Sequence, residues 1–95
     1  MNKYEVAIVI SSLLGEEERA AVLDQAKGYI ERHGGNITEV ADWGKRKLAY
    51  EIQKQAEGYF YFVKVDAEPN MSVELEKELR IMENLLRYLI VRVDE

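Results

Sequence analysis

The hydrophobic pattern of the chain changes period several times, and the order of these changes constrains the fold most. Apolar and polar residues alternate over Lys3–Ile10, as in a half-buried β-strand. From Glu16 onwards apolar residues recur every three or four positions, which indicates an amphipathic helix. Extended patterns follow over Asn36–Ile52 and Tyr59–Ala67, and a second helical pattern precedes a last extended segment, Leu85–Val93. The predicted order is strand, helix, strand, strand, helix, strand.

Local signals mark the boundaries of these segments. Gly34-Gly35 is expected to end the first helix, because glycine adopts the left-handed C-cap conformation at little cost. The apolar positions of the second strand do not keep one alternating phase, so a bulge or bend is expected near Trp43-Gly44. The polar stretch Gln53–Gly58 is interpreted as a hairpin connection.

The second helix follows the only proline of the chain, Pro69. Asn70 or Ser72 is available to cap its N-terminus. Its predicted apolar stripe consists of Val73, Leu75, Leu79 and Met82.

This order of elements predicts one α+β domain over residues 1–95. The expected architecture is the split βαβ, ferredoxin-like sandwich, a four-stranded antiparallel sheet with both helices on one face. The other face of the sheet then has no covering layer. An uncovered face of this kind is typical of a domain that works by binding.

The composition argues against catalysis and against metal or cofactor sites. The chain has no cysteine and one histidine, His33, which we interpret as a capping or surface residue. No glycine-rich phosphate motif is present, and Ser11, Ser12 and Ser72 have no base nearby in sequence. We therefore expect a non-enzymatic protein without cofactor, metal or small-molecule substrate. The lack of a long apolar run predicts a cytoplasmic protein without a membrane span.

The charge distribution is uneven. The net charge of -5 argues against a polyanion partner, but local cations matter more than the sum because salt screens distant charges. Basic residues gather at Lys45-Arg46-Lys47 and, with Lys3 on the neighbouring first strand, at Arg80, Arg87 and Arg92. These cations are suited to phosphate binding. Alternatively, Lys45–Lys47 only protects an edge strand against aggregation, and spacing alone favours neither interpretation.

Four consecutive aromatic residues, Tyr59-Phe60-Tyr61-Phe62, must point alternately to the two faces of a strand. Val63 and Val65 are expected to face the helices, which places Phe60 and Phe62 on the open face. Rings there can stack on bases or anchor a protein partner. Because the pattern of the RNA recognition motif is absent, a protein partner is the favoured interpretation.

Two segments carry a resemblance to a known family. Trp43–Ile52, with the sequence WGKRKLAYEI, resembles the signature of ribosomal protein six of the bacterial small subunit. Glu78–Arg92 is similar to the closing block of that family, and Tyr4-Glu5-Val6 and Gly58-Tyr59-Phe60 match it as well. The resemblance covers essentially the whole chain.

The resemblance implies a ferredoxin-like protein without catalytic activity. It implies binding to the central domain of small-subunit ribosomal RNA together with ribosomal protein eighteen. The RNA-binding residues would then be Lys3, Arg46, Arg80, Arg87 and Arg92, to which the run adds Lys45 and Lys47. The protein partner would bind the open face and its edge, where we expect Trp43, Phe60, Phe62 and Leu89.

Three other functions are compatible with the same order of elements. A small-molecule-sensing regulatory domain shares it, but would need a pocket with convergent polar groups. An acyl- or phosphoryl-transferring enzyme would need an activated nucleophile, for which no sequence signal exists. A homodimer that closes its sheets face to face would cover the open face with a second copy.

Overall fold

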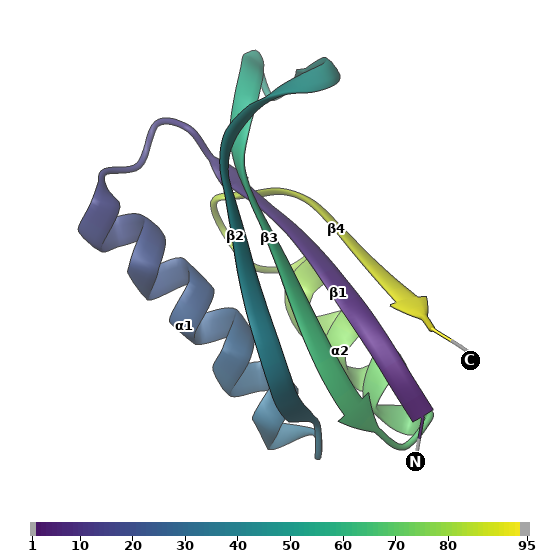
Figure 1. Ribbon diagram of the computed structural model, residues 1–95. Helices are drawn as coiled ribbons and strands as arrows, with labels where there is room; N and C mark the ends of the chain where they lie inside the picture. Colours follow the sequence, from purple (N-terminus) through teal and green to yellow (C-terminus); the bar gives the residue numbers. More distant parts are fainter. Residues whose placement is uncertain (1, 94–95) are drawn as a thin grey trace.

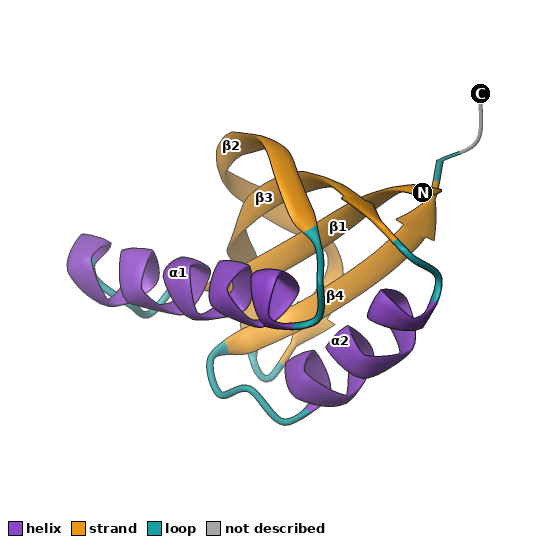
Figure 2. Cartoon of the chain, turned by 90° about the horizontal axis from the view of Figure 1, so that it is seen from below, coloured by secondary structure: helices purple, strands orange, loops and turns teal. Residues whose placement is uncertain are grey.

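The elements occur in the predicted order in the structure, a computed structural model that describes residues 2–93. They are β1 (Asn2–Ser11), α1 (Glu16–Arg32), β2 (Asn36–Ile52), β3 (Gln55–Ala67), α2 (Asn70–Arg80) and β4 (Leu85–Arg92). The four strands form one sheet in the order β2-β3-β1-β4, and every neighbouring pair is antiparallel. Both helices lie on the same face of this sheet (Figures 1 and 2). The predicted ferredoxin-like fold is therefore confirmed.

The core lies between the sheet and the two helices. The alternation over Lys3–Ile10 predicts that alternate residues of β1 share one face, and Tyr4, Val6, Ile8 and Ile10 are all buried. They stand opposite alternate residues of β3, from Tyr59 to Val65, and pack against the apolar sides of α1 and α2. The period-two pattern of β1 thus fixes which face of the sheet meets the helices.

The first helix ends as the glycine pair predicts. Gly34 has a φ of 87°, and its N–H donates to the carbonyl of Glu31 at 3.1 Å. The N–H of Gly35 donates to the carbonyl of Ile30 at 2.9 Å, which completes a Schellman motif. A Cβ added to Gly35 would lie 2.6 Å from Ile30 Cγ2 and 2.9 Å from Val65 Cγ1, so this position also allows the helix to approach the sheet.

The second helix differs from the prediction in two respects. Its N-cap is Pro69 and no side chain caps it; the Ser72 hydroxyl instead donates to the carbonyl of Pro69 at 2.9 Å. Val73 is 57% exposed, whereas Met71 is buried together with Leu75 and Leu79. The reason is geometric: Met71 lies one turn from Leu75 and on its side, whereas Val73 lies two residues away and points elsewhere.

The connection between β2 and β3 is shorter than predicted. Ile52 pairs with Gln55, so only Gln53 and Lys54 form the turn, with φ values of 50° and 63°. Two positive φ values are typical of a type I′ hairpin, which is usually built with asparagine and glycine. The polar character of residues 55–58 reflects an exposed strand end rather than a loop.

The predicted bend near Trp43-Gly44 is confirmed. The register between β2 and β3 shifts between Asp42 and Gly44, so Trp43 is an extra residue on β2. Gly44 has a φ of 73°, and its N–H donates to Asp42 Oδ1 at 2.8 Å. This bulge redirects the outer part of the β2–β3 hairpin, which in Figure 1 curls away at the top of the sheet.

Candidate functional site: the open face of the sheet

The face of the sheet opposite the helices carries alternate residues of all four strands, which the register aligns in rows. The central row is apolar and consists, in the order of the sheet, of Ala41, Phe62, Ala7 and Leu89. Leu89 on the edge strand β4 is 50% exposed, and Phe62 is half-buried. We call these four residues the apolar row. It offers a contiguous apolar surface that runs from one edge strand to the other.

Trp43 extends this surface from the bulge of β2. Its ring lies 4.8 Å from the ring of Phe62, centroid to centroid, and the indole is 53% exposed. Arg46 also lies over the Trp43 ring, with Cζ 5.2 Å from the ring centroid, and its Nε donates to the Trp43 carbonyl at 3.1 Å. The predicted open-face position of Phe62 is confirmed. Trp43 lies beside Phe62, and Arg46 lies beside Trp43.

The next row towards the hairpin combines aromatic and cationic groups. It consists of Gly44, Phe60, Val9 and Arg87. The end of β2 borders this row, and together they form a groove of about 290 Å³. We call it the hairpin groove; its lining residues are Val9, Lys47, Leu48, Ala49, Tyr50, Ile52, Phe60 and Arg87. Two predicted RNA-binding residues, Lys47 and Arg87, thus share a concavity with the predicted partner-binding residue Phe60.

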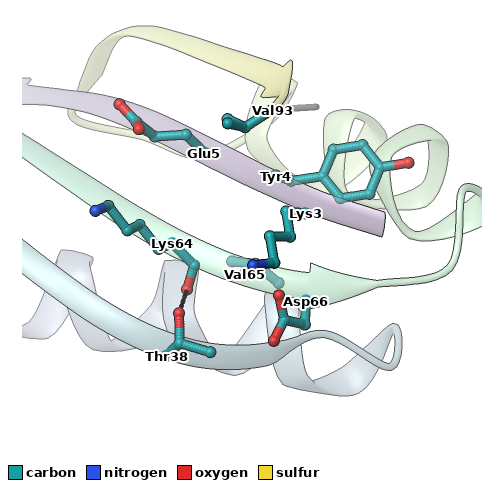
Figure 3. A pocket seen from close by; sticks show the side chains of 8 residues that line it. All are labelled: Lys3, Tyr4, Glu5, Thr38, Lys64, Val65, Asp66 and Val93. Atoms are coloured by element: carbon teal, nitrogen blue, oxygen red, sulfur yellow. Dashed lines mark hydrogen bonds between the residues drawn. The ribbon is translucent and has the colours of Figure 1, made fainter. Parts of the chain in front are cut away.

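The row on the opposite side of the apolar row alternates in charge. Lys64 Nζ lies 3.4 Å from Glu39 Oε2, and Glu5 and Val91 continue the row across the sheet. A second groove of about 430 Å³ lies at this end of the sheet, and Lys3, Glu5, Thr38, Lys64 and Asp66 line it (Figure 3).

The side chains of this charged groove limit its attraction for an anion. Figure 3 shows Lys3 extending towards Asp66, whereas Tyr4 points the other way, to the helix side. The Thr38 hydroxyl donates to the carbonyl of Lys64 at 3.3 Å. Because carboxylates and ammonium groups share this concavity, its field is weak compared with that of the hairpin groove.

The predicted basic residues do not form one cluster. Lys3 was expected to join Arg87 and Arg92, and its carbonyl does accept from Val93 N–H, next to Arg92, at 2.7 Å. Arg87, however, stands opposite Val9, at the other end of β1. Arg87 and Arg92 are five residues apart on β4. This spacing corresponds to roughly 17 Å along the strand and places the two side chains on opposite faces of the sheet.

Two further cations lie outside the open face. Arg80 is the last residue of α2 and exposed, in the helix layer. Lys45 pairs with Tyr59, whose side chain packs against the core on the helix side. The open face therefore carries Arg46 and Arg87 near the hairpin, where Lys47 lines the hairpin groove, and Lys3 at its other end. Lys45, Arg80 and Arg92 lie on the helix side.

The sequence did not predict that residues 48–51 of β2 form the outer wall of the hairpin groove. Tyr50 is 63% exposed and lines the groove, but no pattern in residues 48–51 indicated that position. Between the pairs Lys47–Glu57 and Ile52–Gln55, β2 has four residues where β3 has only Ala56. This mismatch pushes β2 outwards, and only knowledge of the register reveals it.

No helix within the described range is long and apolar enough to cross a bilayer. Across residues 2–93 no three histidine or acidic side chains come together in a way that could hold a metal ion.

The fold and the open face define the class of protein: a ferredoxin-like domain whose uncovered sheet displays an apolar centre with cations beside it. A family model described as ribosomal protein S6 matches residues 3–92. The chain belongs to the ribosomal protein S6 family and is thus a protein of the small ribosomal subunit. The resemblance seen in Trp43–Ile52 and Glu78–Arg92 is confirmed.

Individual relatives agree with this assignment over the full chain. The small ribosomal subunit protein bS6 of Caldanaerobacter subterraneus subsp. tengcongensis is 46% identical over 95 residues, which is 100% of both chains. The bS6 protein of Thermoanaerobacter pseudethanolicus is 43% identical over the same length and also covered completely. The crystal structure of 30S ribosomal protein S6 from Thermotoga maritima is similar with a TM-score of 0.91 and 31% identity, covering 97% of this chain and 87% of that chain.

Proposed function

We propose that this chain is a cytoplasmic, non-catalytic component of the small ribosomal subunit that binds the central domain of the ribosomal RNA together with ribosomal protein eighteen. The observation that carries this proposal is the division of the open face into an apolar row and a cationic hairpin end. One part is suited to a protein surface and the other to phosphates. A domain with both can join a protein and an RNA in one assembly.

The RNA contacts are assigned to the basic residues. Arg46, Lys47 and Arg87 lie at the hairpin end, Lys3 lies at the other end of the open face, and Lys45, Arg80 and Arg92 lie on the helix side. Arginine and lysine side chains neutralise phosphates and fix the register of a protein on RNA without reading bases. Arg46 and Arg87 on the open face, with Lys47 in the hairpin groove, would direct the RNA to the hairpin end of the sheet.

The protein contacts are assigned to the apolar row and its aromatic neighbours. Trp43, Phe60, Phe62 and Leu89 present exposed or half-buried apolar surface on the open face. Large aromatic side chains of this kind are the usual anchors of protein interfaces. We assign ribosomal protein eighteen to this surface.

The fluorescence of Trp43, the only tryptophan, tests the protein contact directly. Burial of the exposed indole by ribosomal protein eighteen should shift its emission to shorter wavelength. Leu89→Asp should weaken the complex at least tenfold, because it places a charge within a buried apolar interface. Val73→Asp is the matched control: Val73 is equally exposed but lies on α2, in the helix layer, and should leave the complex unchanged.

The RNA contact is tested with a fragment of the central domain, with and without ribosomal protein eighteen. We expect weak binding by the chain alone and much tighter binding by the pair. Tight binding by the chain alone, or equal effects of Leu89→Asp and Val73→Asp on the complex, would refute the proposed division of the face.

A further inference from the structure

The hairpin groove has two properties that the binding of a regular RNA helix does not require. It is hollowed, with an apolar floor that includes Val9, Ile52 and Phe60, and an exposed tyrosine, Tyr50, lines it. Phosphates of a duplex are contacted by cations on any convex or flat surface. A hollow apolar floor beside cations instead suits a ligand that has both a flat apolar part and an anionic part.

The charge of the groove is exceptional for this chain. Acidic residues outnumber basic ones by 18 to 13, yet the lining contains Lys47 and Arg87 and no acidic side chain. Within residues 2–93, no ion pair joins Lys47 or Arg87 to a carboxylate. Arg87 thus faces no carboxylate of the lining, and Lys47 has Glu57 as its cross-strand neighbour without an ion pair between them.

The aromatic groups favour a nucleotide over a peptide. Tyr50 and Phe60 line the same groove as the two cations. Grooves that combine cations with aromatic rings bind single-stranded nucleic acids, because every base has a face that can stack on a ring. The groove crosses the face of the sheet, from the hairpin end of β2 to Phe60, Val9 and Arg87 on the other three strands.

We infer that the hairpin groove binds one unpaired nucleotide of the RNA, with the base stacked on Tyr50 and its phosphate held by Lys47 and Arg87. This inference rests on the proposed RNA-binding function. It adds that the groove selects an unpaired nucleotide over a base-paired one. The outward displacement of residues 48–51 on β2 provides the wall against which the base lies.

The direct test titrates the full chain with a short single-stranded oligouridylate and with a duplex of the same length, followed by amide chemical shifts. The single strand should shift the signals of Val9, Ile52 and Phe60, and the duplex should not. Tyr50→Ala should weaken oligouridylate binding about tenfold, and Tyr50→Phe should restore it, because the ring and not the hydroxyl stacks. Tyr50 is exposed to solvent in the native fold, so the spectra of both variants should otherwise be unchanged.

Three results would overturn the inference. Equal binding of oligouridylate by wild type and Tyr50→Ala would exclude stacking on this ring. A preference for the duplex would exclude an unpaired nucleotide. Shifts in the groove that occur only with ribosomal protein eighteen would assign the groove to a protein segment. In each case, retained binding of the central-domain fragment by the pair would leave the proposed function standing, whereas its loss would refute that function separately.

Discussion

Gly35 shows how one residue sets the distance between a helix and the sheet. An added Cβ would lie 2.6 Å from Ile30 Cγ2, and also 2.9 Å from the Ile30 carbonyl oxygen, which belongs to the backbone and cannot rotate away. Gly35→Ala should therefore lower the free energy of unfolding by about 1–3 kcal/mol, the usual cost of overpacking. Urea denaturation followed by circular dichroism measures this change.

Gly28 is the matched control for Gly35. It lies within α1 and is exposed, and nothing lies within 4 Å of an added Cβ. Gly28→Ala should stabilise the protein by about 0.5–1 kcal/mol, because alanine loses less backbone entropy in a helix. Changes of the same sign for both variants would contradict the assigned role of Gly35.

A residue's role could be predicted where it depends on near neighbours in sequence. The helix end at Gly34-Gly35 and the bend at Trp43-Gly44 were both predicted, because each is a local backbone requirement. The capping of α2 was not, because the helix begins at Asn70 and its N-terminus has no side-chain cap. The exposed position of Val73 was also missed, because the predicted stripe included Val73 in place of Met71.

The β2–β3 hairpin turns on two residues that are poorly suited to their backbone conformation. Gln53 and Lys54 both have positive φ, which costs a residue with a Cβ about 1–2 kcal/mol. Lys54→Gly should stabilise the hairpin by about 0.5–1 kcal/mol, since glycine adopts this conformation without strain. Slower hydrogen exchange of the Ile52 and Gln55 amides in Lys54→Gly would show this stabilisation of the hairpin. Lys54→Ala removes the same charge but keeps the Cβ, so it should give no such gain.

The first residue of β3 fastens the loop that leads from β1 to α1. Gln55 Oε1 accepts from Ser11 Oγ at 3.0 Å, from Ser12 N–H at 2.9 Å and from Ser12 Oγ at 3.2 Å. Ser11 is buried, so its hydroxyl depends on this partner. Gln55→Ala should lower the free energy of unfolding by about 1–3 kcal/mol, the cost of leaving buried donors unsatisfied.

Comparison of Gln55→Glu with Gln55→Ala separates the effect of the lost hydrogen bonds from that of the lost side-chain packing. The carboxylate keeps acceptor oxygens at the same place and should retain most of the stability that Gln55→Ala loses. Thermal unfolding of both variants measures the difference. Equal losses would mean that packing, and not the acceptor oxygen, holds the loop.

The elements of the fold could be predicted, but the candidate site could be predicted only in part. The alternation in β1 and β3 sufficed to place Phe60 and Phe62 on the open face. The hairpin groove depends on a register in which four residues of β2 stand against one of β3, and a sequence pattern does not contain that number. Arg87 and Arg92 appeared clustered in sequence, but the strand separates them along its length and between its faces.

In the whole molecule, the distribution of charge matters more than its sum. The chain carries a net charge of -5, yet Arg46, Lys47 and Arg87 gather at the hairpin end of the open face. The acidic first turn of α1, Glu16-Glu17-Glu18, begins a helix on the opposite side of the sheet. Under the proposed function, this uneven distribution of charge favours the approach of RNA to the hairpin end of the open face.

This separation predicts how salt affects RNA binding. If Arg46, Lys47 and Arg87 each neutralise a phosphate, these three cations should contribute about -2 to -3 to the slope of the logarithm of the binding constant against the logarithm of salt concentration. Arg87→Gln should reduce the magnitude of the slope by about 1, because one phosphate contact is lost. Arg32→Gln removes the same charge from α1, where Arg32 lies 3.5 Å from Glu78 in the helix layer, and should leave the slope unchanged. Titrations of the central-domain fragment with the pair of proteins at several salt concentrations measure the slopes of the wild type and of both variants. Identical slopes for the two variants would mean that RNA responds to the net charge of the molecule and not to its open face.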